Sequence, residues 1–569
     1  MARQSVEEIK EESRGLYGKI AETLLSEESH FDESEYQLLK FHGTYQQDNR
    51  DSRRERRKQK LDKEWSFMVR TKMPSGTLTA EQYLAHHNMA NQLGNTTMRL
   101  TTRQGIQLHG ILKGDLRDTI RSISDCGLTT WGACGDVVRN TMAPAIPINS
   151  LAHNEARNLA SEISSRFDAK TTSYSSIWLN GEKLDLDNTH EEAPTEEPIY
   201  GKLYLPRKFK IGIAIPPVND VDLFSQDIGL VLHQEDRNVV GYSIYVGGGF
   251  GMTHGIKTTY PALAKPLFYC GKENVAEACE AIVKVQRDYG DRSDRKHARL
   301  KYLVNEKGID WFRTKVCERI DFQTQDVKSD NFNSVADALG WHEQGDGKMF
   351  LGVHVAQGRI KDDETTQNRS AFKKITETIS CPVRITPNAN IYFYDIDEKN
   401  RELVNSILAE YNIEIGDNFS GARQTAHACV ALPTCGLALS ESERVFSELL
   451  DSIDKVLEDF KLSEEQILIR MTGCPNGCAR PYNADFAFVG RAPKKYAMFV
   501  GGSSAGDRLA RLYKKSVDFE QIKDEIKQVL AGFVSNRTQN EKFSDFWNRT
   551  QSSDSEADPL QFHLDDSER

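Results

Sequence analysis

The sequence has no apolar run that approaches the roughly 20 residues needed for a membrane-spanning helix. Its first residues, MARQSVEEIKEESRG, are charged throughout and contain no hydrophobic segment of the kind that a secretory signal requires. We therefore expect neither a membrane protein nor a secreted one, and predict a soluble protein of the cytoplasm.

Cysteine is scarce, with ten in 569 residues, which is too sparse for a disulfide scaffold. The net charge of −11 argues against wholesale binding to nucleic acid, although it allows a local basic pocket. No G-x-G-x-x-G follows a strand, and the Gly-rich VGGGFG at 246–251 is interpreted as a turn near a cofactor. The chain is thus not expected to use a dinucleotide on its own. An apolar share of 38% predicts a folded chain, with about three domains at this length.

Two stretches repeat one order of elements, which predicts an internal duplication. Each has a strand, a helix and an alternating segment, covering 65–73, 80–93 and 97–111 in the first stretch and 349–360, 368–380 and 382–396 in the second. Arg99 and Arg384 occupy equivalent places in the two alternating segments. A longer strand-rich unit also repeats, with 209–251 matched to 484–502 and Arg139 matched to Arg423.

Four cysteines form two pairs in the last third of the chain, Cys429-x5-Cys435 and Cys474-x3-Cys478. Four thiolates suit a cubane iron–sulfur cluster or tetrahedral zinc. Structural zinc pairs usually have about two to four intervening residues, and the first pair has more. Both pairs are surrounded by Gly, Pro and Ala, which let backbone amides approach cluster sulfides. The pattern favours a cluster, with zinc or structural thiols as alternatives.

The first half carries a set of basic residues, several of them on predicted strands. Its members are Arg70, Arg99, Arg103, His109, Arg139, Arg207, Lys208 and Lys210. Even spacing on a strand places Lys208 with Lys210, and Arg99 with Arg103, on a common face. Converging cations in an acidic protein indicate a polyanionic ligand, whereas each residue alone is as well explained by a surface salt bridge.

Segments from FHGTYQQDNRD (41–51) to about residue 515 resemble the nitrite/sulfite reductase superfamily, and within it the haemoprotein (beta) subunits of the NADPH-linked sulfite reductases. The segments that carry the resemblance are RLTTRQGIQLHGI, DVVRNTMA, YLPRKFKIGIAIPPVND, VGGGFG, RDYGDRSDRK, ACVALPTC and TGCPNGC. The combination of TGCPNGC with the C-x5-C pair is highly specific to this superfamily.

The resemblance implies two cofactors, a [4Fe–4S] cluster and sirohaem. Cys429, Cys435, Cys474 and Cys478 would hold the cluster, and Cys478 would also be the axial ligand of the sirohaem iron. Arg70, Arg139, Lys208 and Lys210 would bind sulfite on the distal side of the iron. Arg99, Arg103, His109 and Arg207 would contact sirohaem carboxylates or order the pocket, with Asn476 close by.

The resemblance also implies an α+β fold in which ferredoxin-like half-domains and two larger α+β domains surround a pseudo-twofold axis. The expected divisions are a polar N-terminal arm (1–60), the first half-domain (61–137), the first sirohaem-binding domain (138–335), the second half-domain (336–415), the cysteine-bearing domain (416–550) and an acidic tail (551–569).

The implied activity is assimilatory six-electron reduction of sulfite to sulfide, with NADPH and flavins acting only through a flavoprotein (alpha) subunit in a hetero-oligomer. The arm, which includes the basic run at 50–60, is one candidate docking site for that subunit. A ferredoxin-dependent sulfite or nitrite reductase is the nearest alternative. A zinc-stapled binding protein would account for the cysteines but not for the basic strand residues.

Overall fold

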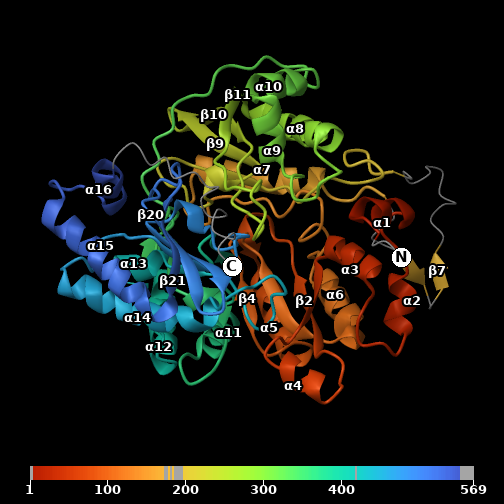
Figure 1. Cartoon of the computed structure of the whole chain (residues 1–569), viewed down its shortest axis with the longest axis horizontal. Coiled ribbons are helices and arrows are strands. Elements are labelled where there is room, and N and C mark those ends of the chain that lie inside the picture. Colours follow the sequence, from red (N-terminus) through yellow and green to blue (C-terminus); the bar gives the residue numbers. More distant parts are fainter. Residues whose placement is uncertain (1–3, 172–176, 180–181, 185–195, 417–418, 552–569) are drawn as a thin grey trace.

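The structure, a computed structural model, describes residues 4–171, 177–179, 182–184, 196–416 and 419–551. It contains four larger sheets with helices packed against them, and the chain runs from the right-hand side of Figure 1 over the top to the left-hand side. The predicted tail, 551–569, lies outside the described residues apart from Gln551. The short strands β6 (Ile177–Leu179) and β7 (Glu182–Leu184) pair with each other antiparallel.

Two five-stranded sheets form the half-domains, and their strand orders match position by position. The first sheet, in spatial order, consists of β1 (Thr44–Asp48), β2 (Trp65–Arg70), β5 (Ile106–Ile111), β4 (Met98–Leu100) and β14 (Arg359–Ile360). The second consists of β12 (Gly340–Glu343), β13 (Met349–Val353), β16 (Ile391–Ile396), β15 (Val383–Ile385) and β3 (Thr77–Leu78). Their helices are α5 (Ala80–Gln92), α6 (Leu116–Asp125), α11 (Asn368–Ile379) and α12 (Arg401–Glu410).

The two half-domains exchange their shortest strands. The strand β14, from the second half of the chain, pairs with β4, and β3, from the first half, pairs with β15. Arg99 and Arg384 lie on β4 and β15 and both face the exchanged strand, which confirms their predicted equivalence. Apolar residues of both sheets, such as Phe67 and Phe393, form one continuous core. The half-domains are therefore a single folding unit.

The two larger domains also share one topology. The first has β8 (Ile211–Ala214), β9 (Ile228–Glu235), β10 (Asn238–Val246) and β11 (Lys265–Gly271) with α7 (Leu151–Arg166), α8 (Val275–Tyr289), α9 (Leu300–Lys307) and α10 (Ile309–Cys317). The second has β17 (His427–Ala428), β18 (Ile469–Thr472), β19 (Phe486–Ala492), β20 (Lys495–Val500) and β21 (Arg511–Asp518) with α13 (Gly421–Thr425), α14 (Glu443–Asp459), α15 (Ile522–Asn536) and α16 (Phe543–Thr550). In each, a parallel strand pair precedes an antiparallel meander.

The register shows where the duplicated units correspond. The Oδ2 atom of Asp227 accepts a hydrogen bond from the backbone N–H of Lys210 at 2.9 Å, and that of Asp485 accepts from Leu468 at 2.8 Å. Hence β8 corresponds to β18, and the counterpart of 209–251 begins near Leu468. The predicted match to 484–502 was too short, because strand β18 leads directly into a cysteine motif that hides its pattern.

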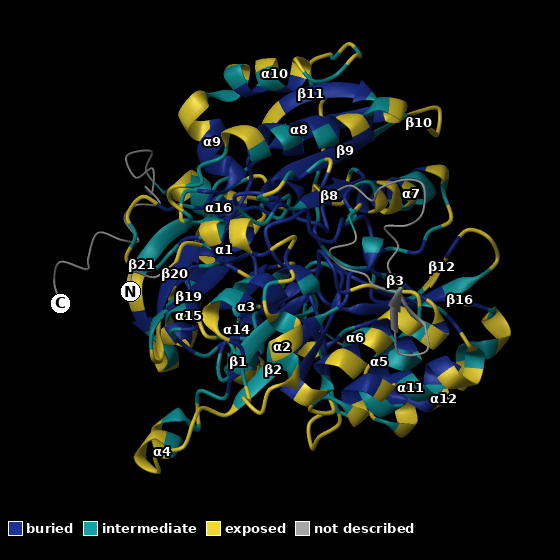
Figure 2. Ribbon diagram, turned by 90° about the vertical axis from the view of Figure 1, so that its right-hand side faces the viewer, coloured by how far each residue is buried: buried dark blue, intermediate teal, exposed yellow. Residues whose placement is uncertain are grey.

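The N-terminal segment belongs to the folded body, which differs from the solvated arm expected for 1–60. Strand β1 extends the first sheet, and Leu16 and Phe41 are buried in the core of the first larger domain. The segment also forms α1 (Val6–Glu12), α2 (Ile20–Leu25), α3 (Glu33–Leu39) and α4 (Arg53–Lys58). Of these, α4 projects from the body and is mostly exposed (Figure 2). The polar composition of residues 1–60 led to the wrong prediction of an arm. The charged residues lie on the outer faces of helices whose apolar faces pack against the body.

None of the described helices is both long and apolar enough to cross a membrane.

Candidate functional site

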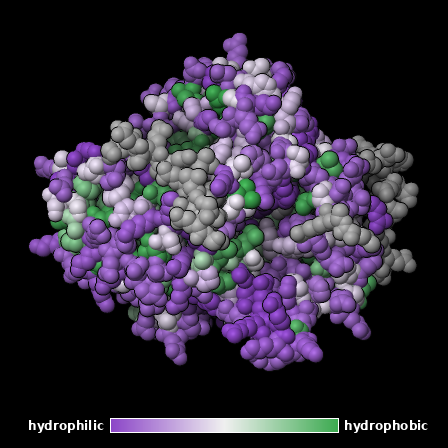
Figure 3. All heavy atoms as spheres, in the orientation of Figure 1, coloured by the Kyte–Doolittle hydropathy of each residue, from purple (hydrophilic) through white to green (hydrophobic). Residues whose placement is uncertain are grey.

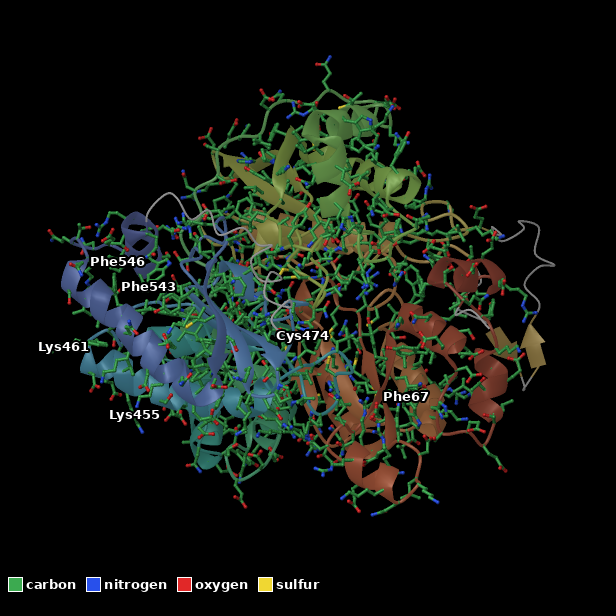
Figure 4. All side chains as sticks on the ribbon, in the orientation of Figure 1. Phe67, Lys455, Lys461, Cys474, Phe543 and Phe546 are labelled. Atoms are coloured by element: carbon green, nitrogen blue, oxygen red, sulfur yellow. The ribbon has the colours of Figure 1, made fainter. Side chains whose placement is uncertain are left out.

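The four paired cysteines lie on two loops that leave the same edge of one sheet. The strands β17 and β18 are parallel neighbours, so the segments that follow them, which carry Cys429 and Cys474, start side by side. The backbone N–H of Cys429 donates to the carbonyl of Met471 at 3.2 Å. Figure 4 labels Cys474 at the junction between the two halves of the molecule. All four thiols are free.

The thiols lie close enough to affect one another's ionisation. Burial, and next to it the neighbouring Cys478, raise the pKa of Cys435 to about 11 and that of Cys474 to about 12. The same two causes raise the pKa of Cys429. Binding of a cation would have to displace these protons, as is usual for thiolate ligands.

Hydrogen-bond donors already face two of the sulfur atoms. The backbone N–H of Gly473 lies 3.3 Å from Sγ of Cys429, and Nδ2 of Asn476 lies 3.5 Å from Sγ of Cys474. A Cβ atom at Gly473 would come within 2.5 Å of the Cβ of Ala431, so only glycine allows this approach. Donors of this kind stabilise cluster-bound thiolates.

The donor set of the two cysteine loops suits an iron–sulfur cluster. Across the described ranges, no three His, Cys, Asp or Glu side chains converge closely enough to hold one metal ion. A structural zinc ion needs four ligands at bonding distance of one centre. Four thiols that influence one another's ionisation, with small residues around them, are the donor set that a cubane cluster uses.

Arg70 and Arg139 form one side of a cationic space. Both guanidinium groups donate through Nη1 to the carbonyl of Ala133, Arg70 at 3.3 Å and Arg139 at 3.2 Å. Arg139 is also held by the carbonyl of Gly135 at 2.9 Å. Two like charges that bind one acceptor repel each other. An anion bound between them would offset this electrostatic repulsion.

Lys208 and Lys210 connect this cationic space to the cysteines. Burial, followed by the charge of Arg207, lowers the pKa of Lys208 to about 7, while Cys478 acts in the opposite direction. Burial and the charges of Arg103 and Lys208 hold the pKa of Lys210 well below its usual range. The structure therefore brings Lys208 within electrostatic reach of Cys478, on the other half of the chain.

The remaining predicted residues divide into two kinds. His109 is buried, and neither of its ring nitrogens has a hydrogen-bond partner in the protein. Burial, followed by Arg359 and Arg99, holds its pKa far below the usual range, so the ring is neutral and its N–H is available to a ligand. Burial, followed by Arg295, lowers the pKa of Arg207 to about 10. A carboxylated macrocycle would satisfy both residues.

Arg99 and Arg103, in contrast, are engaged by the protein. Arg99 donates to the carbonyl of Ala428 at 2.7 Å and forms an ion pair with Glu443 at 3.0 Å. Arg103 donates to Oε1 of Gln226 at 2.8 Å and to the carbonyl of Asn140 at 2.6 Å. They join the first half-domain to the two larger domains, Arg103 to the first of them and Arg99 to the second.

The Gly-rich turn predicted to lie near a cofactor contacts the second cysteine loop. The N–H of Met252 donates to the carbonyl of Pro475 at 2.9 Å, and a Cβ on Gly251 would lie 3.4 Å from the carbonyl oxygen of Asn476. Nζ of Lys301 binds the carbonyls of Gly249 and Gly251 at 3.1 and 2.9 Å. The turn thus packs against the loop that carries Cys474 and Cys478.

Several charged residues of the site were missed in the sequence. Asp227 forms a buried ion pair with Arg299 at 2.9 Å, and Asp222 accepts from Arg470 at 2.8 Å and Arg480 at 2.9 Å. Arg480 stands two residues after Cys478, and this proximity was the one available signal. The others lie on segments whose positions only the fold relates.

Two protein-family models match parts of the chain. The model "Nitrite/Sulfite reductase ferredoxin-like half domain" matches residues 59–125 and 342–411, and "Nitrite and sulphite reductase 4Fe-4S domain" matches 164–324. The latter range is the copy without paired cysteines.

The chain is 44% identical over 542 residues to the "Sulfite reductase [NADPH] hemoprotein beta-component" of Staphylococcus saprophyticus, covering 95% of this chain and 94% of that one. It is 42% identical over 559 residues to the protein of the same name from Oceanobacillus iheyensis, covering 98% and 96%. The solved structure of Mycobacterium tuberculosis NirA has the same fold, with a TM-score of 0.77 at 22% identity and 96% of each chain covered. The duplicated fold, the cysteine loops and these relatives together establish that the chain belongs to the nitrite and sulfite reductase family.

Proposed function

We propose that this protein is the haemoprotein subunit of an assimilatory sulfite reductase, which reduces sulfite to sulfide by six electrons. The observation that carries the proposal is that the basic residues and the paired cysteines come together at Lys208. This lysine lies within electrostatic reach of both Arg139 and Cys478. A cationic space built next to a cluster site suits reduction of a small anion. The relatives named above carry the same activity in their names.

Two cofactors belong to this function, sirohaem and a [4Fe–4S] cluster. Cys429, Cys435, Cys474 and Cys478 would hold the cluster, and Cys478 would link it to the sirohaem iron. When bound, this coupled pair would supply single electrons and a metal centre that can bind the sulfur atom of sulfite. His109, Arg207 and Asn476 would face the macrocycle, as the unpartnered ring nitrogens of His109 indicate.

The cations of the first half would bind and protonate the substrate. Arg70 and Arg139 would hold the sulfite oxygens and offset negative charge as oxygen leaves, because the planar guanidinium offers several N–H donors to an anion. Lys208 and Lys210 would donate the protons needed to release water, because an ammonium group with a lowered pKa gives up its proton readily. Arg99 and Arg103 would fix the pocket between the halves.

The electron donor would be a flavoprotein subunit that oxidises NADPH. The curated relatives are named as a beta-component of an NADPH-dependent enzyme, and this sequence has no dinucleotide fingerprint of its own. The ten free thiols agree with a reducing compartment such as the cytoplasm. The domain divisions expected from the sequence are part of this proposal, with the N-terminal segment now assigned to the body.

The test is a visible absorption spectrum of purified protein, combined with assays for iron and acid-labile sulfide. We expect sirohaem bands and about five irons per chain, four in the cluster and one in the macrocycle. Steady-state turnover with sulfite and with nitrite then ranks the two acceptors, and we expect sulfite to be preferred. A colourless zinc protein from a host that makes sirohaem would refute the proposal.

A further inference from the structure

The first cysteine loop is anchored at its ends and loosely packed at its apex. It runs from Cys429 to the residue before α14, and its second end is fixed where Leu439 and Ser440 donate to the carbonyl of Gly473 at 2.8 and 3.1 Å. Cys435 lies between these anchors. The loop must therefore be held at its middle if the thiol of Cys435 is to keep its place.

Within the apex, residues 433–438, the local contacts are few. The side chain of Leu437 is 67% exposed, and a Cβ on Gly436 would find no atom within 4 Å. The N–H of Ala438 donates to the carbonyl of Cys435 at 3.2 Å, which is a bond inside the apex itself. Packing alone does not fix this segment.

Arg50 supplies the missing contacts from another part of the chain. Its Nη1 atom donates to the carbonyls of Cys435 at 3.0 Å and Ala438 at 2.6 Å, and its own N–H donates to the carbonyl of Pro433 at 3.1 Å. Within the described part of the chain, these are the hydrogen bonds that join 433–438 to residues outside the cysteine loop. The guanidinium thus spans both ends of the turn that carries Cys435.

The turn that presents Arg50 is closed by hydrogen bonds between its own residues. Asp48 and Arg53 close it with two hydrogen bonds, of 2.5 and 2.7 Å, and Oδ1 of Asn49 accepts from the N–H of Asp51 at 3.1 Å. Asp51 then pairs with Arg444 on α14 at 2.6 Å. The segment 48–53 is therefore closed by its own hydrogen bonds, and the pair of Asp51 with Arg444 joins it to α14, directly after the cysteine loop.

We propose that Arg50 is a positioning residue for the iron–sulfur cluster, which clamps the apex of the first cysteine loop and keeps Cys435 in ligating geometry. The inference rests on the proposed function, since it requires the cluster to sit on the four cysteines. Without the clamp the apex gains freedom, Cys435 leaves the cluster more often, and the cluster is lost faster. Arg50 touches neither substrate nor reacting atoms.

The experiment compares wild type with Arg50→Met, Arg50→Lys and Arg57→Met, all purified with cofactors under anaerobic conditions. Arg57 is an exposed residue of α4, the hydrophilic projection at the lower edge of Figure 3, and it controls for the loss of one nearby positive charge. The readouts are acid-labile sulfide per chain and the rate at which cluster absorption bleaches when air and an iron chelator are added. Neither readout depends on turnover.

We expect Arg50→Met to bleach roughly tenfold faster than wild type, because a hydrogen bond from a charged donor contributes about that factor or more. Arg50→Lys should fall between the two, because lysine keeps the charge but its side chain ends one bond short of the position that Nη1 of Arg50 occupies between the two carbonyls. Arg57→Met should match wild type.

Three results would overturn the inference: bleaching of Arg50→Met at the wild-type rate, equal behaviour of Arg50→Lys and wild type, or equal acceleration in Arg57→Met. If Arg50→Met does not fold, the comparison of Arg50→Lys with wild type decides. A wild-type protein that contains no acid-labile sulfide would instead refute the proposed function, which separates the two failures.

Discussion

The two larger domains share a backbone but differ in the chemistry that they present. At the same place in the fold, directly before a strand, the residue whose backbone N–H donates to a buried aspartate is Lys210 in the first domain and Leu468 in the second. The second domain instead carries the paired thiols that follow β17 and β18. Duplication thus produced two copies of a scaffold, and each copy kept one part of a site that neither could form alone.

A buried ion pair joins the two larger domains at corresponding positions. Asp222 and Arg480 both have left-handed backbone conformations, with φ of 47° and 55°, and each precedes a short 3-10 turn that leads into β9 or β19. They occupy corresponding places and bind each other at 2.9 Å. Divergence at these positions therefore produced a complementary contact at the axis.

The largest effect is expected from removing the shared thiol of the second copy. Cys478→Ser should reduce sulfite reduction below detection, because the site loses the residue that would join cluster and macrocycle. Sulfide production with a chemical reductant measures this, together with iron content. Cys317→Ser, at an exposed position of the first domain, should behave as wild type. Full activity of Cys478→Ser would contradict the bridging role.

Next in size is the loss of a cation from the first copy. Lys208→Met should retain both cofactors and lower sulfite turnover by roughly 100-fold or more, as for removal of a general acid. Nitrite turnover should fall less, since the two acceptors differ in their demand for protons and charge. Lys202→Met, whose side chain is 62% exposed, is the control. Equal losses on sulfite and nitrite would argue against a role specific to sulfite.

Breaking the contact between the copies should affect stability. Asp222→Asn leaves the buried Arg470 and Arg480 without their carboxylate, and we expect the free energy of unfolding to fall by about 3–5 kcal/mol. Urea unfolding measures this. Asp326→Asn, on a side chain that is 92% exposed, should change stability by at most about 0.5 kcal/mol. A similarly small change in Asp222→Asn would show that the axis pair does not hold the copies together.

The smallest effect concerns pH. Lys208 donates only while protonated, so kcat/KM for sulfite should fall as pH rises through its pKa, by up to tenfold per unit. That pKa is about 7 in the ligand-free site, and bound anions would raise it because they favour the ammonium. Lys208→Arg keeps the charge without a transferable proton and should remove this limb. A limb unchanged in Lys208→Arg would assign the titration to another group.

Local patterns predicted much of the fold. The helix predicted over 80–93 is α5, and Thr79 caps it with Gln82 completing a capping box, because capping depends on residues three positions apart. The alternating segments around Arg99 and Arg384 form equivalent strands, because alternation of apolar residues is also a local pattern. The exchange of β3 and β14 left no such trace, since each strand has two residues and its partner lies in the other half of the chain.

The functional residues divide in the same way. The sequence by itself determined the chemical kinds of group, four thiols at cluster spacing and a set of basic residues, because ligand type and short spacing are local properties. The strand placement predicted for Arg103, Lys208 and Lys210 was wrong, since Arg103 lies in the turn after β4 and both lysines precede β8. Only the tertiary structure decided that Lys208 lies within electrostatic reach of Cys478, that Arg99 joins the two halves of the chain, and that Arg50 bonds to the cysteine loop. Such contacts join residues hundreds of positions apart, and their formation depends on the packing of the whole chain.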